Sequence, residues 1–571
     1  MNWLSLFPAT VLTTALLTAV ALMPIVGPAP SGDDGSVDVE SGTLEFSVAR
    51  AGEHLCEVAS EPHPVGSYHH ARVRAFIVET LKGLGWQVQI QEGEVDSIPL
   101  ANIVARRGGA ASTGTVVLAC HYDSVPAGPG AADDGVAVAA LLEVARVVGV
   151  GPVARNDLIL LFTDGEELGL LGAELFMANH PAADEIGVVV NFEARGNSGP
   201  SIMFETSPQN GRLIREYADV APCPIASSLA YAVYKLLPND TDMSVFKRAD
   251  IDGLNFAFIG GFDAYHTGFD TPDNLSVRSL QHHGASALAL ARRFGEVDLR
   301  DLRAPDEVFF SVADGLFVHY PESWVGPGLG IALVVATALV VLAIRHGGVS
   351  FSSLVCALWA FSRMFVEVPL LVLVLWGGPW LILSLFVEEY GPPIGEVTSA
   401  HVSVIGVLVL TSGLLKGRLA IALLGSRCGS TALAIVGLAP TLGLLVVTSL
   451  FLGGASYLFF WTFLSSSVGL FCVLALRVPI ESGCARFLVA VSALPGVVLF
   501  GQTSYLVYLA LMKTPYFGAL TVSAFSLCLW GAILPFLDLP ATGSSSVRRV
   551  AVVMVGFGIL VVGLVLRVLG L

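Results

Sequence analysis

The chain has 571 residues, of which 54% are hydrophobic and only 13% are charged. Because roughly 25% charged residues is typical of soluble proteins, this composition predicts that a large part of the chain lies in a membrane. The formal net charge of -17 argues against a nucleic-acid-binding protein, since phosphate recognition requires clustered lysine and arginine. We therefore expect a lipid bilayer, and no nucleic acid, among the partners of this chain.

Three parts are expected along the chain. Residues 1–27 are almost entirely apolar and long enough to cross a bilayer core of about 30 Å, so we predict a retained transmembrane anchor, with a cleaved signal peptide as the alternative. Residues 28–324 have the mixed composition of a globular domain. Residues 325–571 are again rich in apolar stretches and predict an all-α bundle of about eight transmembrane helices.

The charges in the loops predict how the chain is oriented in the membrane. The expected spans are 326–344, 364–387, 398–415, 430–452, 456–476, 487–511, 517–537 and 550–567. Loops with several Lys and Arg residues alternate with loops that hold one Lys among them, so the positive-inside rule places the globular domain on the non-cytoplasmic side. That side is the exterior for a bacterial plasma membrane, and the lumen for a vacuole or endoplasmic reticulum.

Two kinds of pattern alternate within the globular part. Short apolar, β-branched or alternating runs predict strands at 86–91, 115–120, 157–163, 187–193 and 253–260. Helical apolar spacing predicts helices at 69–85, 135–148 and 169–180. We therefore predict an α/β fold in which helices sandwich a mostly parallel mixed sheet, with ligands at the carboxyl ends of the strands.

Acidic and imidazole side chains follow these predicted strands. They are His121 and Asp123, then Asp133 and Asp134, then Asp164, Glu166 and Glu167, then Glu193, and finally His266 and Asp270. So many carboxylates at one edge of a sheet would repel one another and shift their pKa values unless a cation lay among them. Histidine and carboxylate donors without thiolate suit Zn²⁺, so the sequence predicts a metal site.

Each cluster has a simpler explanation when it is taken alone. Asp133 and Asp134 could cap the following helix, and Glu166 and Glu167 could occupy a first helical turn, where the helix dipole favours acids. His266 could be an exposed loop residue. The convergence of five clusters favours the metal site over these explanations. Five other histidines, in contrast, are expected at the surface or in packing: His63, His69, His70, His282 and His283.

The motifs "HYDS", "GAADDG", "FTDGEELGLLGA", "NFEARG" and "YHTGFDTPDN" stand in the order and spacing of a known ligand pattern. The chain resembles the co-catalytic zinc exopeptidases that include aminopeptidase Y and glutamate carboxypeptidase. Its peptidase-like part followed by many spans is similar to the membrane-anchored branch of vacuolar membrane protease and endoplasmic reticulum metallopeptidase. The resemblance covers roughly residues 55–295 and implies a zinc exopeptidase-like fold.

The same resemblance implies roles for individual residues and two Zn²⁺ ions. His121 and Glu193 would complete one zinc site, Glu167 and His266 the other, and Asp133 would bridge the two ions. Asp123 would orient the His121 ring, and Glu166 would act as general base, taking a proton from water and passing it to the leaving amine. Glu193 departs from the pattern, because many relatives have Asp at this position. Asp240 and Asp242 also lie in a family-like segment, without an assigned role.

The expected function is that of a membrane-bound zinc aminopeptidase, which removes N-terminal residues from peptides. Two alternatives remain open at this point. One is acyl transfer of the glutaminyl cyclase type, and the other is a non-catalytic receptor or transporter with a relict peptidase domain. The multi-span part is expected to serve in anchoring, substrate presentation or homo-oligomer formation.

Overall fold

The computed structural model describes residues 44–235, 239–313, 316–346, 349–372, 374, 429–478 and 482–510. The predicted anchor and the spans expected at 398–415, 517–537 and 550–567 lie outside these residues. The chain divides after Glu322 into two compact units, one globular and one helical.

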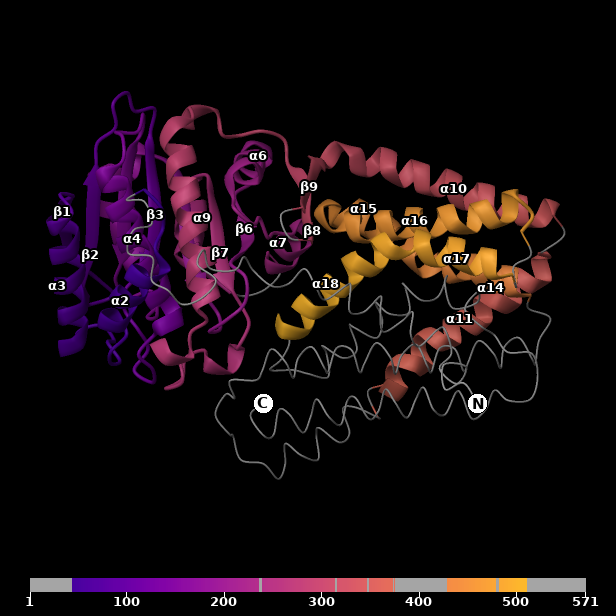
Figure 1. Ribbon diagram of the computed structural model, residues 1–571, viewed down its shortest axis with the longest axis horizontal. Coiled ribbons are helices and arrows are strands. Elements are labelled where there is room, and N and C mark those ends of the chain that lie inside the picture. The colour runs from indigo at the N-terminus through magenta and orange to yellow at the C-terminus, as the bar shows by residue number, and fades with distance from the viewer. Residues whose placement is uncertain are drawn as a thin grey trace. The chain divides into compact units, whose positions relative to one another are not determined.

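A seven-stranded sheet with the spatial order β1-β2-β4-β3-β5-β7-β6 forms the centre of the globular unit (Figure 1). The strands are β1 (Gln87–Val95), β2 (Ile98–Arg107), β3 (Thr115–His121), β4 (Asp157–Thr163), β5 (Ile186–Ala194), β6 (Ile202–Thr206) and β7 (Gly253–Phe258). The central strands β4, β3, β5 and β7 are parallel, whereas β1, β2 and β6 pair with their neighbours in antiparallel fashion. The prediction of a mixed sheet with a parallel core is confirmed.

β3 lies in the middle of the sheet and is buried along its whole length. Val116 and Leu118 belong to the hydrophobic core on one face, and Val117 and Ala119 belong to the core on the other, because side chains alternate along a strand. A strand that is buried on both faces reads as a continuous apolar run. This explains why the predicted strand at 115–120 coincides with β3 except for its last residue.

Helices cover both faces of the sheet. The larger core includes residues of α2 (Val48–Val58), α3 (Tyr68–Gly83), α4 (Val136–Val150), α6 (Gly211–Val220) and α9 (Val277–Glu296). The core on the opposite face includes residues of α5 (Leu171–Asn179) and α8 (Asp242–Arg248). Farther along the unit, α7 (Ser228–Tyr234) packs against β6 and β8 (Glu307–Ala313), and β8 pairs with β9 (Leu316–Pro321).

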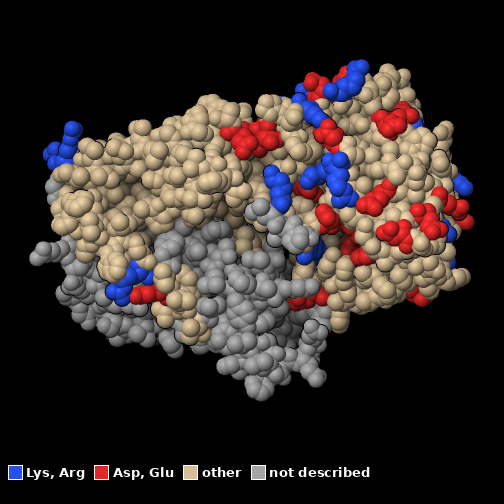
Figure 2. All heavy atoms as spheres, turned by 180° about the vertical axis from the view of Figure 1, so that it is seen from behind, with Lys and Arg blue, Asp and Glu red and all other residues tan. Residues whose placement is uncertain are grey.

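Apolar helices make up the described part of the helical unit. They are α10 (Val325–Arg345), α11 (Phe351–Val372), α14 (Ser430–Gly437), α15 (Ala439–Phe451), α16 (Ser456–Ala475), α17 (Gly483–Ser492) and α18 (Leu494–Ala510). Four stretches of these described residues, 322–345, 351–372, 430–451 and 453–475, are long and apolar enough to cross a membrane. Figure 2 shows that charged side chains gather over the globular unit, whereas few lie on the visible surface of the helical unit.

The second predicted span differs from the structure at its start. We expected it to begin at residue 364, but α11 begins at Phe351, so that Arg363 lies inside the helix and not in the preceding loop. Arg363 pairs with Glu367 one turn later, with 2.7 Å between Nη2 and Oε1. Hydropathy marked Arg363 as a boundary, but a charge that is paired at positions i and i+4 is compatible with a continuous helix.

The close packing of α5 against the sheet can be tested at Gly172. A Cβ atom added there would clash with the backbone of Asp164, and the Gly172 carbonyl already accepts a hydrogen bond from Asn102 Nδ2 at 2.8 Å. We therefore expect Gly172→Ala to lower the free energy of unfolding by about 1–3 kcal/mol, as overpacking does. Thermal melting of the full chain in detergent measures this change.

Gly52 in α2 provides the matched control, because no heavy atom lies within 4 Å of a Cβ built at this glycine. Alanine is the better helix former by about 1 kcal/mol. Gly52→Ala should therefore raise the melting temperature, and a rise of similar size in Gly172→Ala would contradict the packing argument.

Candidate metal centre and active site

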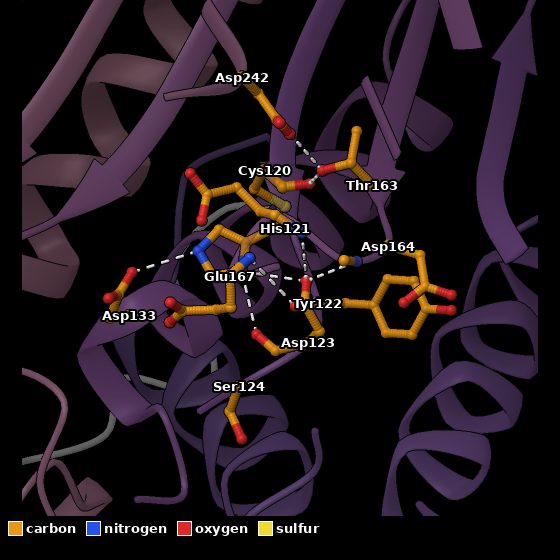
Figure 3. Close-up of polar contacts among 12 residues, drawn as sticks. Cys120, His121, Tyr122, Asp123, Ser124, Asp133, Thr163, Asp164, Glu167 and Asp242 are labelled. Atoms are coloured by element: carbon orange, nitrogen blue, oxygen red, sulfur yellow. Dashed lines mark hydrogen bonds and ion pairs between the residues drawn. The ribbon is translucent and has the colours of Figure 1, made fainter. Parts of the chain in front are cut away.

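The residues predicted for the site meet at the carboxyl ends of the parallel strands. His121 ends β3, and Glu193 lies one residue before the end of β5. The other members lie in loops that follow strands: Asp133 between β3 and α4, Glu166 and Glu167 after β4, and His266 after β7. Figure 3 shows the side chains of His121, Asp133 and Glu167 facing one another. The chain leaves β3 toward β4 on one side and later enters β5 on the other, and ligands bind at such a switch point in open α/β sheets.

One carboxylate lies between two histidines. Oδ1 of Asp133 is 3.2 Å from Nε2 of His121, and Oδ2 of Asp133 is 3.1 Å from Nε2 of His266. His266 Nε2 also lies 3.1 Å from Glu167 Oε2, and His121 Nε2 lies 3.8 Å from Glu193 Oε2. The five predicted ligands therefore form one continuous cluster, with Asp133 at its centre.

Asp123 is buried beneath this cluster and joins two loops. Its Oδ1 accepts hydrogen bonds from the backbone N–H groups of Gly165 at 2.9 Å and Glu166 at 3.1 Å, and Oδ2 accepts one from Glu167 at 3.3 Å. The same carboxylate lies 3.5 Å from Nδ1 of His121, and that nitrogen also lies 3.0 Å from the Asp123 carbonyl oxygen. Asp123 thus contacts the His121 ring and holds the turn that carries the two glutamates.

Two buried asparagines support Glu193. Asn191 Nδ2 donates to Glu193 Oε1 at 3.1 Å and to Asn255 Oδ1 at 3.1 Å, and Asn255 Nδ2 donates to Glu205 Oε2 at 3.0 Å. The chain of contacts ends at Lys247 in α8, whose Nζ lies 2.5 Å from Glu205 Oε1. Sequence reasoning did not find these residues, because a single asparagine within an apolar strand has no distinctive pattern.

Two further aspartates support the site without contacting the histidines. The Asp270 carboxylate accepts hydrogen bonds from the backbone N–H groups of Ala132 at 2.7 Å and Asp133 at 3.2 Å. Oδ2 of Asp242 accepts a hydrogen bond from the Thr163 hydroxyl at 2.5 Å (Figure 3). Asp270 therefore holds the loop that carries the central ligand, and Asp242 is the member of the pair Asp240 and Asp242 that lies near the site.

Burial makes the carboxyl groups of the cluster difficult to ionise without a cation. It raises the pKa of Glu166 well above its usual value, and the negative charge of Glu193 raises it further. Burial also raises the pKa values of Glu193 and Asp134 well above normal, and that of Asp242 to about 6. These shifts are those of acids crowded together in a low-dielectric environment.

The histidines respond in the opposite way. Burial alone would lower the pKa of His266, but its contacts with Asp133 and Glu167 outweigh burial and raise the pKa to about 9. The pKa of His121 is likewise raised well above its usual value, because Asp123 and Asp133 outweigh burial. In return, the two histidines lower the pKa of Asp133 in spite of its burial. Without a metal ion, the cluster therefore holds protons that a metal would displace.

The donor atoms fit a metal ion. His121, Asp133 and Glu167 offer ligand atoms within 4.8 Å of one another, and His121, Asp134 and Glu193 form a second such group. Glu167 Oε1 and both carboxylate oxygens of Asp134 are buried without a hydrogen-bond partner. Because buried, unpaired carboxylate oxygens are costly, a cation at these positions would offset the cost. Asp134, to which the sequence assigned no ligand role, is therefore part of the cluster.

His70 was expected at the surface or in packing, but it has a specific polar partner. It is buried, and its Nε2 lies 2.8 Å from Oδ1 of Asp164. Oδ2 of Asp164 accepts a hydrogen bond from the backbone N–H of Ala101 at 2.8 Å. Asp164, one of the acids at the strand ends, therefore ties α3 and β2 to the end of β4 instead of facing the metal-binding cluster.

These features define a membrane protein with a zinc exopeptidase-like domain. Residues 102–291 match the sequence model of Peptidase family M28. The predicted resemblance to this class and to its membrane-anchored branch is confirmed.

The sequence is similar to that of two curated proteins, one named as a metallopeptidase and the other as a membrane protease. The chain is 34% identical over 251 residues to endoplasmic reticulum metallopeptidase 1 of Mus musculus, covering 42% of this chain and 28% of the relative. It is 28% identical over 352 residues to vacuolar membrane protease of Yarrowia lipolytica, covering 56% of this chain and 34% of the relative. The matched region thus spans about a third of the length of these relatives.

Part of this chain is also similar in fold to solved structures. An aminopeptidase from Aneurinibacillus sp. strain AM-1 is 13% identical, with a TM-score of 0.38, and the match covers 44% of this chain and 95% of that chain. A glutaminyl cyclase from Porphyromonas gingivalis is 24% identical, with a TM-score of 0.36, and the match covers 43% of this chain and 96% of that chain.

Asp123 can be tested separately from the metal ligands. Asp123→Ala removes the acceptor that holds the backbone of residues 165–167 and orients His121, so we expect zinc affinity to fall about 10–100-fold, as it does when outer-shell partners of metal sites are lost. Competition with a chromogenic chelator measures this affinity. Asp157→Ala is the control, because Asp157 also accepts a backbone hydrogen bond, from Gly109 at 2.7 Å, but lies at the amino end of β4. Equal losses of affinity in both variants would contradict the role of Asp123.

The raised pKa of His266 predicts a pH dependence of stability for the zinc-free protein. Because its pKa is about 9 in the folded state, against 6.5 for an unperturbed histidine, its contribution is fully present below pH 6.5 and is lost as the pH rises through 9. The melting temperature of the zinc-free protein should therefore fall more steeply from pH 6.5 to 9 than that of His266→Asn. Asparagine suits the left-handed backbone at this position, where φ is 59°. Parallel curves for the two proteins would contradict the shift.

Proposed function

We propose that this chain is a membrane-bound zinc metallopeptidase that acts as an aminopeptidase on peptide substrates. The observation that carries the proposal is the single carboxylate of Asp133, whose two oxygens each face the Nε2 atom of a different histidine. A carboxylate in this position suits the bridge between two metal ions. The M28 domain at 102–291 and the metallopeptidase names of the curated relatives support the assignment.

The described residues would hold two zinc ions. His121 and Glu193 would bind one ion, Glu167 and His266 the other, and Asp133 both, while Asp123 keeps the His121 ring in place. Zinc supplies Lewis acidity and lowers the pKa of water at such sites. Asp134 has buried oxygens without partners and lies near His121 and Glu193, so it would add negative charge that favours dications over monovalent ions.

Glu166 is suited to move protons between the reacting groups. Burial and the negative charge of Glu193 raise the pKa of its carboxyl group well above the usual value, so its carboxylate is a stronger base than that of a free glutamate. Oε of Glu166 would accept a proton from the attacking water and donate it to the leaving amine. Asp123 fixes the backbone N–H of Glu166, so the base is held by the same residue that holds His121.

The complete set of ligand side chains favours an enzyme over a relict domain, because a domain that had lost catalysis would have no need to keep five donors together, three of them buried. We further propose that residues 1–27 anchor the chain and that residues 28–324 face the non-cytoplasmic side. The helical part, residues 325–571, would hold the peptidase domain at the membrane and could mediate self-association. The four apolar stretches of membrane length support membrane attachment.

Substitutions of the neighbouring residues Glu166 and Glu167 test proton transfer and metal binding separately. Glu166→Gln removes the proposed base but no proposed ligand, so hydrolysis of aminoacyl-nitroanilides should fall about 10²–10⁴-fold while the zinc content remains. Glu167→Gln removes a ligand beside His266, so both zinc content and activity should fall. The readouts are nitroaniline release by the full chain in detergent and elemental zinc analysis.

A chelator provides the reference state for both variants. The wild-type protein should lose activity with the chelator and regain it when zinc is restored. Cleavage that is insensitive to the chelator, or wild-type activity in Glu166→Gln, would refute the proposed chemistry.

A further inference from the structure

Arg195 lies over the rings of Phe262 and Tyr265, of which Tyr265 is next to the proposed metal ligand His266 in the sequence, although none of the assigned roles uses this arginine. It follows Glu193 by two residues, and its backbone N–H donates to the Phe258 carbonyl at 2.9 Å, which continues the pairing of β5 with β7. Because side chains alternate along extended backbone, residues 193 and 195 leave the chain on the same side. The strand that supplies a metal ligand therefore also supplies an arginine at the edge of the site.

An aromatic shelf supports this arginine. Cζ of Arg195 lies 5.3 Å from the ring centre of Phe262 and 5.9 Å from that of Tyr265, and these two rings stack with their centres 5.7 Å apart. The Tyr265 ring in turn stacks on the ligand His266, with 3.8 Å between ring centres. Contact with aromatic faces attracts a guanidinium and holds it in position. Arg195 is thus connected to the metal cluster through a continuous stack of rings.

The guanidinium of Arg195 is exposed and has no carboxylate within ion-pair distance among the residues that the structure describes. Some other arginines of the globular unit have carboxylate partners: Arg106 pairs with Asp157 at 2.5 Å, and Arg303 pairs with Asp252 at 3.0 Å. Arginine presents a planar fork of donors that matches a carboxylate. The rings of Phe262 and Tyr265 beneath Arg195 leave those donors available. The arrangement is that of a positioned cation without its anion.

We propose that Arg195 binds a carboxylate of the substrate and so directs the site toward peptides with an anionic group close to the bond that is cleaved. The proposal rests on the peptidase function proposed above. An extended peptide advances about 3.3–3.6 Å per residue, so up to about three residues suffice to cross the shelf formed by Phe262, Tyr265 and His266. The carboxylate can belong to an acidic side chain or to the C-terminus of a short peptide.

Two pairs of substrates distinguish these sources. Ala-Ala and Ala-Ala-amide differ in the C-terminal carboxylate, and Glu-Ala-amide and Gln-Ala-amide differ in the side-chain carboxylate. With the zinc-loaded full chain in detergent, we expect kcat/KM to favour the acidic member of at least one pair. Arg195→Ala should reduce that preference about 10–100-fold, the range expected for hydrogen bonds to a charged group. Arg195→Lys should retain part of it, because it keeps the charge but loses the fork.

Arg300→Ala is the matched control, because Arg300 is also exposed but is paired with Asp298 at 2.6 Å and lies with the residues that begin β3 and β5. The kcat/KM ratio of Arg300→Ala for the two substrates of each pair should equal that of the wild type. The same acid-to-amide ratio in wild type and Arg195→Ala, in both pairs, would overturn the proposal while leaving the peptidase function intact.

A binding measurement keeps the test independent of turnover. Calorimetric titration of Glu166→Gln with each substrate should show tighter binding of the acidic member, and the added substitution Arg195→Ala should remove the difference. Equal affinities for both members of both pairs would overturn the carboxylate site. If the wild type cleaves no peptide at all but the affinity difference is present, the peptidase function fails and the carboxylate site remains.

Discussion

The carboxylate of Asp133 is the contact on which the rest of the site depends, because it binds two histidines that come from different parts of the sheet. His121 ends β3 and His266 follows β7, and β5 lies between these strands. Only the parallel order β3-β5-β7 brings both imidazoles to one edge within reach of a single side chain. The Glu193 side chain enters the same space from β5 itself. The grouping of the proposed ligands is thus a direct product of the strand order.

Fixing the loops that carry the proposed ligands costs conformational entropy, and hydrogen bonds from their backbone N–H groups offset this cost. Asp123 and Asp270 do not contact both histidines, yet each accepts backbone hydrogen bonds from a loop that carries a proposed ligand. Loops rich in glycine lose considerable conformational freedom on adopting one geometry, and these hydrogen bonds offset that loss. Gly130, with φ at 65°, shows how far the backbone of the Asp133 loop departs from a helix. Carboxylates that bind N–H groups therefore supply the rigidity that a metal site requires.

The parts of this arrangement that depend on local pattern could be predicted from the sequence. β4 coincides with the run predicted at 157–163, because a central strand must be apolar on both faces and its polar ends are sharp. The ends of the apolar runs also made it possible to predict that His121 and Glu193 lie where β3 and β5 end. In the helical unit, the span expected at 430–452 is interrupted at Leu438, and Pro440 in the first turn of α15 is the local reason, since proline favours the start of a helix.

Partners that lie far apart in the sequence could not be predicted in this way. Asp164 was grouped with the metal-binding acids because it follows the same strand as Glu166, but it faces His70, 94 positions earlier. β4 ends at Thr163, and Gly165, with φ at 75°, changes the direction of the chain between Asp164 and Glu166, so the two acids reach different environments. Alternation along extended backbone, in contrast, puts Glu193 and Arg195 on the same side of the chain. Position along a strand is therefore visible in the sequence, whereas the identity of the facing group depends on which distant element packs beside it, as α3 supplies His70 to Asp164 at the end of β4.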